Sequence, residues 1–229
     1  FGADLEKIFS LEKNENSRII EGGEYGHSWC YQNTNRNLIR FFLALGAPKG
    51  NKTNIDLNVP SWISMDKHCE KEFYGSFLGG ELGTPIIHKR GNYLTTLEVG
   101  ITSLPEQKQN RLKVLGSLTN YLKRKRIDIT SIYEGKYKTE GSIILRLLIE
   151  KKLDNVLLFL MNTKINYCSY KIERIYKALG HWAKHKKQKY HELLEKGYGA
   201  ESAMKTLHLT PNSLFILLND FEKEFQAIA

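Results

Sequence analysis

Small residues line one side of a segment that is otherwise helical, and this limits the folds open to the chain. EKEFYGSFLGGELGTP at residues 70–85 predicts a helix from about Cys69 to about Leu82 or Gly83. Positions 75, 76, 79 and 80 of this helix are glycine or serine. Each glycine inside a helix costs about 1 kcal/mol relative to alanine. We therefore expect another backbone, that of a second helix, to lie against this side.

The end of this segment has a counterpart at the start of the chain. LGGEL at residues 78–82 and FGADL at residues 1–5 share an apolar residue, two small residues, an acid and a leucine. This match makes Asp4 and Glu81 candidates for equivalent positions in an internal duplication. The chain opens without methionine inside this expected helix, so we expect a preceding segment in the natural protein.

The offset between the two acids, 81 − 4 = 77, also superimposes two amphipathic segments. Residues 38–47 fall on residues 115–124, and their apolar positions recur at the intervals of one helix face. A β-like stretch lies between acid and helix in both copies, at residues 17–33 and 92–101. Chance alignment of two apolar helix faces is the alternative to duplication, and the shared acid favours duplication.

The second copy continues with a clear order of strands and helices. Two apolar runs around EGKYKTEG at residues 134–141 predict a β-hairpin with a glycine-containing loop. Residues 153–164 and 170–188 read as helices, and the second of these is strongly basic. The sequence as a whole predicts an α+β fold with internal duplication.

The last forty residues predict three short amphipathic helices. The second and third are spaced like a helix-turn-helix, with Ala203 where the two helices would touch. Thr210 is placed to cap the third helix, and Pro211 suits its first turn. A plain helical cap on the core is the alternative to a helix-turn-helix.

The charge balance of the chain favours a polyanionic partner. The net charge is +9 and the sequence pI is about 9.3, as in proteins that bind nucleic acid or an anionic membrane surface. No apolar run approaches the 18 residues of a membrane span, and no signal peptide is visible. Cys30, Cys69 and Cys168 lack disulfide or zinc-ligand spacing. We therefore expect a cytoplasmic, intracellular protein with reduced thiols and no membrane partner.

Two carboxylates at the ends of packed helices suggest metal chemistry. If the helices that end in Asp4 and Glu81 pack side by side, their carboxylates meet and repel unless cations lie between them. Mg²⁺ binds through one or two carboxylates together with phosphate oxygens, and it serves phosphodiester hydrolysis by activating water. For a chain this basic, nucleic acid is the natural substrate.

The residues around the second acid resemble a known motif. YGSFLGGEL at residues 74–82 resembles the nine-residue motif of the LAGLIDADG homing endonucleases, with Glu81 at the catalytic acid and Leu82 where glycine is usual. FGADL matches the second half of the motif, with Asp4 at the acid. Residues 35–63 are similar to the segment between the motifs of intein-type and archaeal members. The resemblance extends over roughly residues 1–188.

This resemblance implies a fold and an activity. The fold consists of two αββαββα-like halves, at residues 1–68 and 69–188, which form a pseudo-twofold β-saddle, followed by a C-terminal helical segment at residues 189–229. The activity is that of a monomeric, site-specific endonuclease that cuts double-stranded DNA. Asp4 and Glu81 would hold Mg²⁺, with Mn²⁺ as a substitute and Ca²⁺ as an occupant that does not support cleavage. By position, Lys52 and Lys171 match basic residues that assist near the acids.

The two sheets of the saddle would supply the DNA contacts. Long polar side chains and arginines suit base edges and phosphates. The candidates are Arg18, Glu24, His27, Trp29 and Gln32 in the first half, and His88, Arg90, Tyr93, Thr95 and Glu98 in the second.

Two other functions fit the same fold. One is a DNA-binding regulatory protein that has lost catalysis, and the other is an RNA maturase. Retention of Asp4 and Glu81 favours the enzyme, because a site under no catalytic demand loses an acid at little cost in stability.

Overall fold

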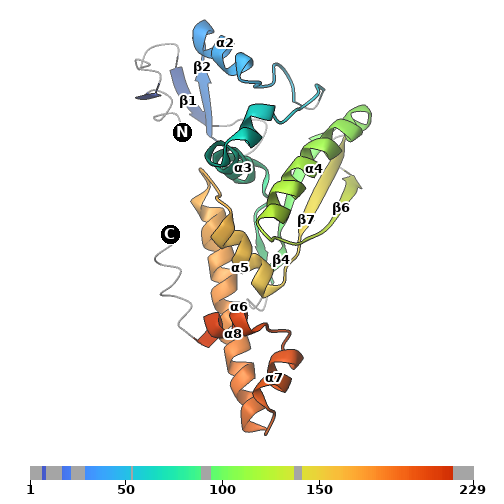
Figure 1. Cartoon of the computed structure of the whole chain (residues 1–229). Helices are drawn as coiled ribbons and strands as arrows, with labels where there is room; N and C mark the ends of the chain where they lie inside the picture. The colour runs from blue at the N-terminus through green and yellow to red at the C-terminus, as the bar shows by residue number, and fades with distance from the viewer. Residues whose placement is uncertain are drawn as a thin grey trace. The chain divides into compact units, whose positions relative to one another are not determined.

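The computed structural model describes residues 7–8, 17–21, 29–52, 54–88, 94–136 and 141–218. Over these residues the chain is an α+β protein, in which helices are interspersed with antiparallel strand pairs. Contacts divide it into two compact units, Phe1–Lys52 and Thr53–Ala229, whose elements are labelled in Figure 1. The division expected at residues 68 and 188 stays a prediction. None of the described helices is both long enough and apolar enough to cross a membrane.

The first unit contains a β-hairpin followed by a helix. β1 (Ser17–Glu21) pairs antiparallel with β2 (Trp29–Asn33), and α2 (Arg36–Ala44) follows. Asn35 caps α2, because its side-chain oxygen accepts hydrogen bonds from two backbone N–H groups of the first turn. The expected order of strands and helix is confirmed here.

The second unit begins with a short 3₁₀ helix, η1 (Ser61–Met65), and the glycine-rich helix α3 (Lys67–Glu81). The bounds of α3 agree with the helix expected from the sequence. Asp66 caps its start, since its carboxylate accepts a hydrogen bond from the backbone N–H of Cys69 at 2.7 Å. This bond holds the pKa of Asp66 below its usual value.

A three-stranded antiparallel sheet forms the centre of this unit. Its order is β5-β7-β6, from β5 (Glu98–Ser103), β6 (Ile129–Lys136) and β7 (Ile143–Ile149). The hairpin expected around residues 134–141 is confirmed by the β6–β7 pairing. A separate two-stranded pair, β3 (Ile86–Ile87) with β4 (Leu94–Thr96), precedes β5.

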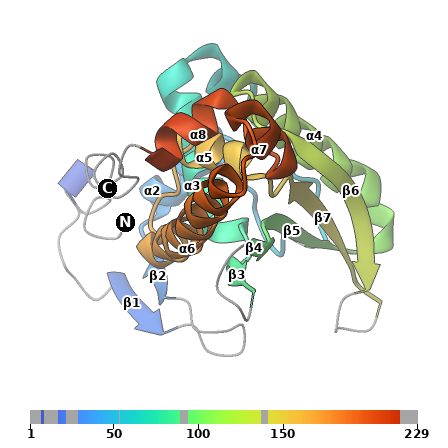
Figure 2. The ribbon, with the colours of Figure 1, turned by 90° about the horizontal axis from the view of Figure 1, so that it is seen from below.

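Helix α4 (Lys108–Arg124), which follows the short η2 (Pro105–Gln107), covers one face of the sheet, as Figures 1 and 2 show. Leu115, Leu118 and Leu122 of α4 are completely buried. Alternate residues of β5 are buried and half-exposed, as expected for a sheet with one covered face. The apolar helix face predicted at residues 115–124 is therefore part of the core.

Stacked tyrosines join α3 to α4. The rings of Tyr74 and Tyr121 lie 4.4 Å apart between centroids at an interplanar angle of 21°. Both side chains are buried, and burial raises the pKa of each hydroxyl to about 12. The two phenols therefore stay neutral at physiological pH, and the contact acts as an apolar one.

The first turn of α4 also holds the segment that enters the second unit. The Asn110 side chain accepts a hydrogen bond from the Leu57 N–H at 2.8 Å and donates one to the Leu57 carbonyl at 3.0 Å. The completely buried Arg111 donates to the Ile55 carbonyl at 2.9 Å. Residues 55–57 are thereby fixed against α4.

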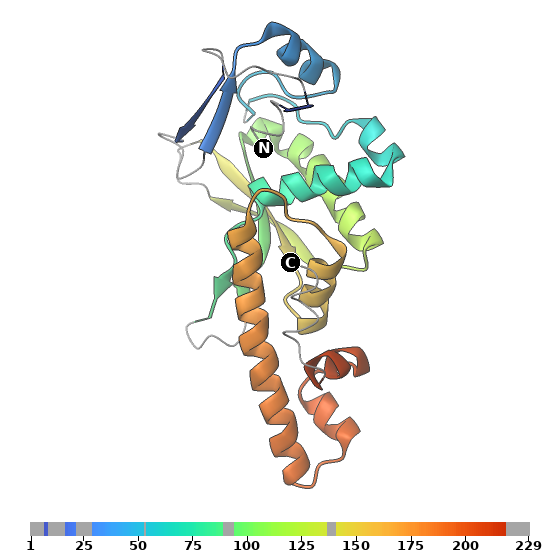
Figure 3. The same cartoon turned by 90° about the vertical axis from the view of Figure 1, so that its left-hand side faces the viewer.

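The C-terminal part of the unit consists of helices alone. α5 (Leu153–Asn162) precedes the long α6 (Ser169–Glu195), and α7 (Ala200–Thr206) and α8 (Pro211–Leu218) pack beside α6 (Figure 3). Three short helices were expected after residue 188, and this is wrong for the first of them. Residues 189–195 continue α6, because neither proline nor glycine interrupts the chain between Gly180 and Gly197.

The expected features of the last two helices are confirmed. Thr210 caps α8: its hydroxyl accepts from the Ser213 N–H at 3.2 Å, while the Ser213 hydroxyl accepts from the Thr210 N–H at 2.9 Å. Ala203 of α7 is completely buried. The exposed side of α8 carries Phe215 and Leu218 and no basic residue, which favours a helical cap over a DNA-reading helix.

The 77-residue offset carries helix α2 and strand β1 onto a helix and a strand of the second unit, but it does not do so for strand β2. Residues 17–21 of β1 shift to 94–98, on β4 and the start of β5. Residues 36–44 of α2 shift to 113–121, inside α4, whereas residues 29–33 of β2 shift to 106–110, at the start of α4. A duplication, if present, has therefore changed the length of its hairpin loops. The pseudo-twofold saddle stays a prediction.

The expectation of a second helix against the small residues of α3 is wrong at two of the four positions. A Cβ added to Gly79 would lie 1.9 Å from the backbone oxygen of Asn166, and one added to Gly75 would lie 3.0 Å from the Asn166 side-chain nitrogen. Asn166 belongs to the loop between α5 and α6, so a loop takes the place expected for a helix. At Ser76 and Gly80 the surface is exposed.

This packing predicts opposite effects for two neighbouring alanine substitutions. Gly79→Ala should lower the free energy of unfolding by about 1–3 kcal/mol, because the new methyl group displaces the backbone at Asn166. Gly80→Ala is the matched control and should raise it by about 0.5–1 kcal/mol, since nothing lies within 4 Å of the added Cβ. Urea denaturation measures both. Equal effects of the two substitutions would contradict the assigned loop contact.

Candidate active site

The candidate site lies where α3 ends and the chain enters the sheet. Glu81 is the last residue of α3, and Leu82 forms an antiparallel bridge with Val99 of β5. The Gly83 N–H donates to the Glu98 carbonyl at 2.8 Å. Glu81 therefore stands at a junction between a helix and a sheet, where main-chain hydrogen bonds fix the backbone on its C-terminal side.

The backbone at Leu82, where α3 ends, does not require glycine. Its φ of −64° lies in a region that any residue adopts, so glycine is not needed for the turn. The side chain is 1% exposed and belongs to the core cluster. Leucine at this position thus anchors the exit of α3 by burial.

Lys171, expected to assist catalysis, makes a structural contact beside the acid. Its Nζ donates to the carbonyl oxygens of Gly79 and Gly80 at 2.6 and 3.3 Å, and the residue is 7% exposed. The last carbonyl groups of a helix have no partner within the helix, and they form the negative end of its dipole. The Lys171 ammonium group supplies a hydrogen-bond donor for these carbonyl groups and a positive charge at the negative end of the dipole. It thereby fixes the turn of α3 from which Glu81 projects.

Two neighbours of Lys171 on α6 hold the segment that follows Glu81. The hydroxyl groups of Tyr170 and Thr84 are hydrogen bonded to each other. Arg174 Nε donates to the Pro85 carbonyl at 2.9 Å. The start of α6 therefore binds both the end of α3 and the chain beyond it.

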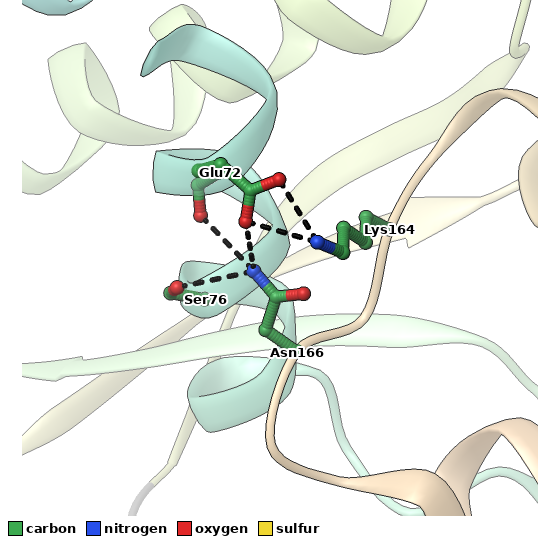
Figure 4. Close-up of polar contacts among 4 residues, drawn as sticks. All are labelled: Glu72, Ser76, Lys164 and Asn166. Atoms are coloured by element: carbon green, nitrogen blue, oxygen red, sulfur yellow. Dashed lines mark hydrogen bonds and ion pairs between the residues drawn. The ribbon is translucent and has the colours of Figure 1, made fainter. Parts of the chain in front are cut away.

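The middle of α3 is held by a second set of polar contacts, drawn in Figure 4. Lys164 Nζ lies 2.9 and 3.1 Å from the two carboxylate oxygens of Glu72. Asn166 Nδ2 donates to the same carboxylate at 3.0 Å, and the Asn166 N–H donates to the Gly75 carbonyl at 2.9 Å. The hydrogen bond from Lys164 lowers the pKa of Glu72. These contacts fix the loop before α6 against α3.

The electrostatics at the end of α3 favour a cation. Glu81 lies at the negative end of the helix dipole, and the last turn contains no basic residue of its own. Lys171 supplies one positive charge from another helix. Glu81 is half-buried and provides the hard oxygen donors that Mg²⁺ prefers.

Two other predicted members of the site, Asp4 and Lys52, belong to the first unit. Asp4 lies outside the described residues, and Lys52 is an exposed residue of the first unit. Among the residues that the structure describes, no group of three or more metal-ligating side chains occurs. A metal here would thus be held by one or two carboxylates together with water or substrate oxygens.

The DNA-contact residues expected in the first unit are described in part. Arg18 lies opposite Gln32 in the β1–β2 ladder, and Trp29 lies opposite the last residue of β1. Glu24 and His27 lie outside the described residues.

The candidates before β5 are also described in part. His88 follows β3 and is half-buried. Thr95 lies in β4, where its hydroxyl donates to the carbonyl of Ile86 at 3.0 Å. Arg90 and Tyr93 lie outside the described residues. Thr95 therefore lies in the β3–β4 pair, whereas His88 follows it, and a DNA contact by either residue stays a prediction.

The face of the three-stranded sheet that α4 leaves uncovered carries polar residues that the sequence analysis did not select. Glu98, which it did select, forms an ion pair with Arg146 of β7. Arg146 pairs across the ladder with Tyr133 of β6, which is exposed. The signal was available, because Arg146 is the one charged residue in the apolar run IILRLLI.

Comparison with known proteins gives a short match. Over 94 residues, or 41% of its length, the chain is 32% identical to DNA-directed RNA polymerase subunit Rpo1N of Methanocaldococcus jannaschii. The matched segment is 7% of that subunit, so the chain is similar to a small part of it. No family model matches the chain. No solved structure matches it.

The capping role of Lys171 predicts a loss of stability on its replacement. Lys171→Met keeps the apolar stem but leaves the carbonyl groups of Gly79 and Gly80 without their donor, which should lower the free energy of unfolding by about 1–3 kcal/mol. Lys177→Met on the exposed side of the same helix is the control and should change it by less than about 0.5 kcal/mol. If urea denaturation finds equal losses, the capping contact is not the cause.

Proposed function

We propose that the chain is a site-specific, double-strand DNA endonuclease of the LAGLIDADG type that acts as a monomer. Glu81 is its catalytic acid in the second half, and Asp4 is the acid in the first half. The sheets bind the DNA, and the ends of the motif helices meet the phosphodiester bonds that are cut.

The observation that carries this proposal is the fixed position of Glu81. The carboxylate is the last group of a helix whose end is capped by Lys171 and whose exit pairs with β5. A metal-ligating carboxylate must be held closely in place, because small displacements of a reacting group lower the rate steeply. Elsewhere in α3, glycine occurs at Gly75 and Gly79, where the loop that contains Asn166 packs closely against the helix. These contacts also hold α3 in place.

A divalent metal fits this acid chemically. Glu81 and Asp4 would hold Mg²⁺, which when bound would activate water and neutralise charge on the phosphate. Glu81 supplies hard oxygen ligands at the negative end of α3.

The arrangement of elements after Glu81 supports the same function. Three strands, β3, β4 and β5, lie between α3 and α4, and β6, β7 and α5 follow. This order resembles that of an αββαββα-like half with one additional strand. The sheet of this unit has a face that α4 does not cover, with Arg146, Glu98 and Tyr133 on it. Polar side chains on an open sheet suit base edges and phosphates in the major groove.

The likeness to the polymerase subunit is compatible with this proposal. A match to 7% of a large subunit does not carry polymerase activity to this chain.

The proposal predicts separate effects on binding and cleavage. Glu81→Gln should keep the fold and the affinity for DNA selected by tight binding, while cleavage in Mg²⁺ falls more than about 100-fold, because only transition-state stabilisation is removed. Asp4→Asn should act in the same way. Glu106→Gln, at an exposed position in η2, is the control and should cleave like the wild type.

Three outcomes would contradict the nuclease. If the wild type binds such DNA without cutting it, even with Mn²⁺, the chain is a DNA-binding regulator. If it prefers structured RNA, the maturase function replaces the nuclease. If Glu81→Gln cleaves like the control, the catalytic acid lies elsewhere.

A further inference from the structure

The solvent-facing side of α6 is a basic stripe. Its five members are exposed and follow one another at intervals of four, three, four and three residues: Lys177, His181, Lys184, Gln188 and His191. This spacing keeps them on one side of an α-helix. The sequence from Arg174 to His191 contains no aspartate or glutamate. Lys177 and Lys184 therefore present two positive charges on this side of the helix, with no acidic residue between them.

Lys177 and Lys184 differ from two other lysines of α6, which make contacts within the fold. Lys171 caps α3, and Lys186 donates to the carbonyl of Leu207 at 2.6 Å, where burial lowers its pKa. In the described part of the chain, neither Lys177 nor Lys184 takes part in an ion pair or a side-chain hydrogen bond.

Some basic residues elsewhere in the described structure are paired with acids. Lys108, Arg124 and Lys164 each lie beside a glutamate. Their charge is therefore partly neutralised within the protein. Among the described residues, Lys177 and Lys184 have no acidic partner, which leaves their charge available to an external anion.

The geometry of the stripe suits a regular polyanion. Lys177, Lys184 and His191 are separated by seven residues each, a rise of about 10.5 Å along the helix. This is close to the rise of three base pairs in duplex DNA, at about 3.4 Å each. The opposite side of α6 is anchored in the core by Ile175 and Leu179, and Figure 3 shows the helix as one continuous rod.

We propose that the basic stripe of α6 binds the phosphate backbone of duplex DNA outside the cleaved site, without reading its sequence. Lysine ammonium groups bind phosphates as point charges, and such contacts add affinity but no base specificity. The choice of DNA as the polyanion rests on the proposed function. A membrane surface fits less well, because the apolar side of α6 is buried in the core and unavailable to lipid.

A double substitution tests the stripe. Lys177→Ala/Lys184→Ala should reduce the slope of log affinity against log salt concentration by about 2 on a duplex of arbitrary sequence, since each phosphate contact contributes about 0.9. Lys113→Ala/Lys123→Ala, two exposed positions on α4, removes the same charge and should leave the slope nearly unchanged. Both variants should retain the circular dichroism of the wild type.

Equal slopes for the two double variants would overturn the inference. The inference would also be overturned if the Lys177→Ala/Lys184→Ala variant lost binding to vesicles of anionic lipid but bound DNA like the wild type. This test is independent of the nuclease proposal, because the dependence of affinity on salt is measured by binding alone and requires no cleavage. If the wild type never cleaves DNA but the Lys177→Ala/Lys184→Ala variant still has the lower slope, the nuclease proposal is contradicted and the DNA-binding role of the stripe is supported.

Discussion

The contact between the Lys171 ammonium and the carbonyl oxygens of Gly79 and Gly80 is the interaction on which the candidate site depends. It satisfies the end of α3 with a charge that the helix itself does not provide. Because Lys171 lies in the first turns of α6, the same helix that carries the basic stripe also fixes the turn that ends in Glu81. Loss of this contact would free the end of α3 without unfolding the rest of the core.

The remaining contacts of α3 act in the same direction. The Asn166 loop packs against Gly75 and Gly79, Glu72 binds Lys164, and Leu82 pairs with β5. Helix, loop and sheet therefore hold one short helix along most of its length. Such rigidity is what a catalytic carboxylate needs, since a site built on supported elements is more precise than one on a free loop.

Local features of the fold could be predicted from the sequence, while contacts between distant segments could not. The bounds of α3, the β6–β7 hairpin and the Thr210 cap follow from glycine, alternation and capping residues within a few positions. The Asn166 contact joins residues about ninety positions apart, and a row of small residues predicts a close backbone without saying which one. Lys171 is a candidate by its position in the resembled family. Its capping contact depends on how α6 packs against α3, which the sequence does not show. The prediction of a separate helix after residue 188 is wrong, because a change in composition alone does not end a helix, and α6 continues to Glu195.

The central claim is that Glu81, held at the end of α3, is a metal-ligating acid at a DNA phosphate. The most direct measurement is a crystal structure of the protein with tightly bound duplex DNA and Ca²⁺ as a metal that does not support cleavage. The account predicts a Ca²⁺ ion bound by the carboxylates of Glu81 and Asp4, next to a phosphate of the backbone. A structure in which Glu81 lies away from the DNA, or in which the two acids lie on opposite sides of the molecule, would contradict it.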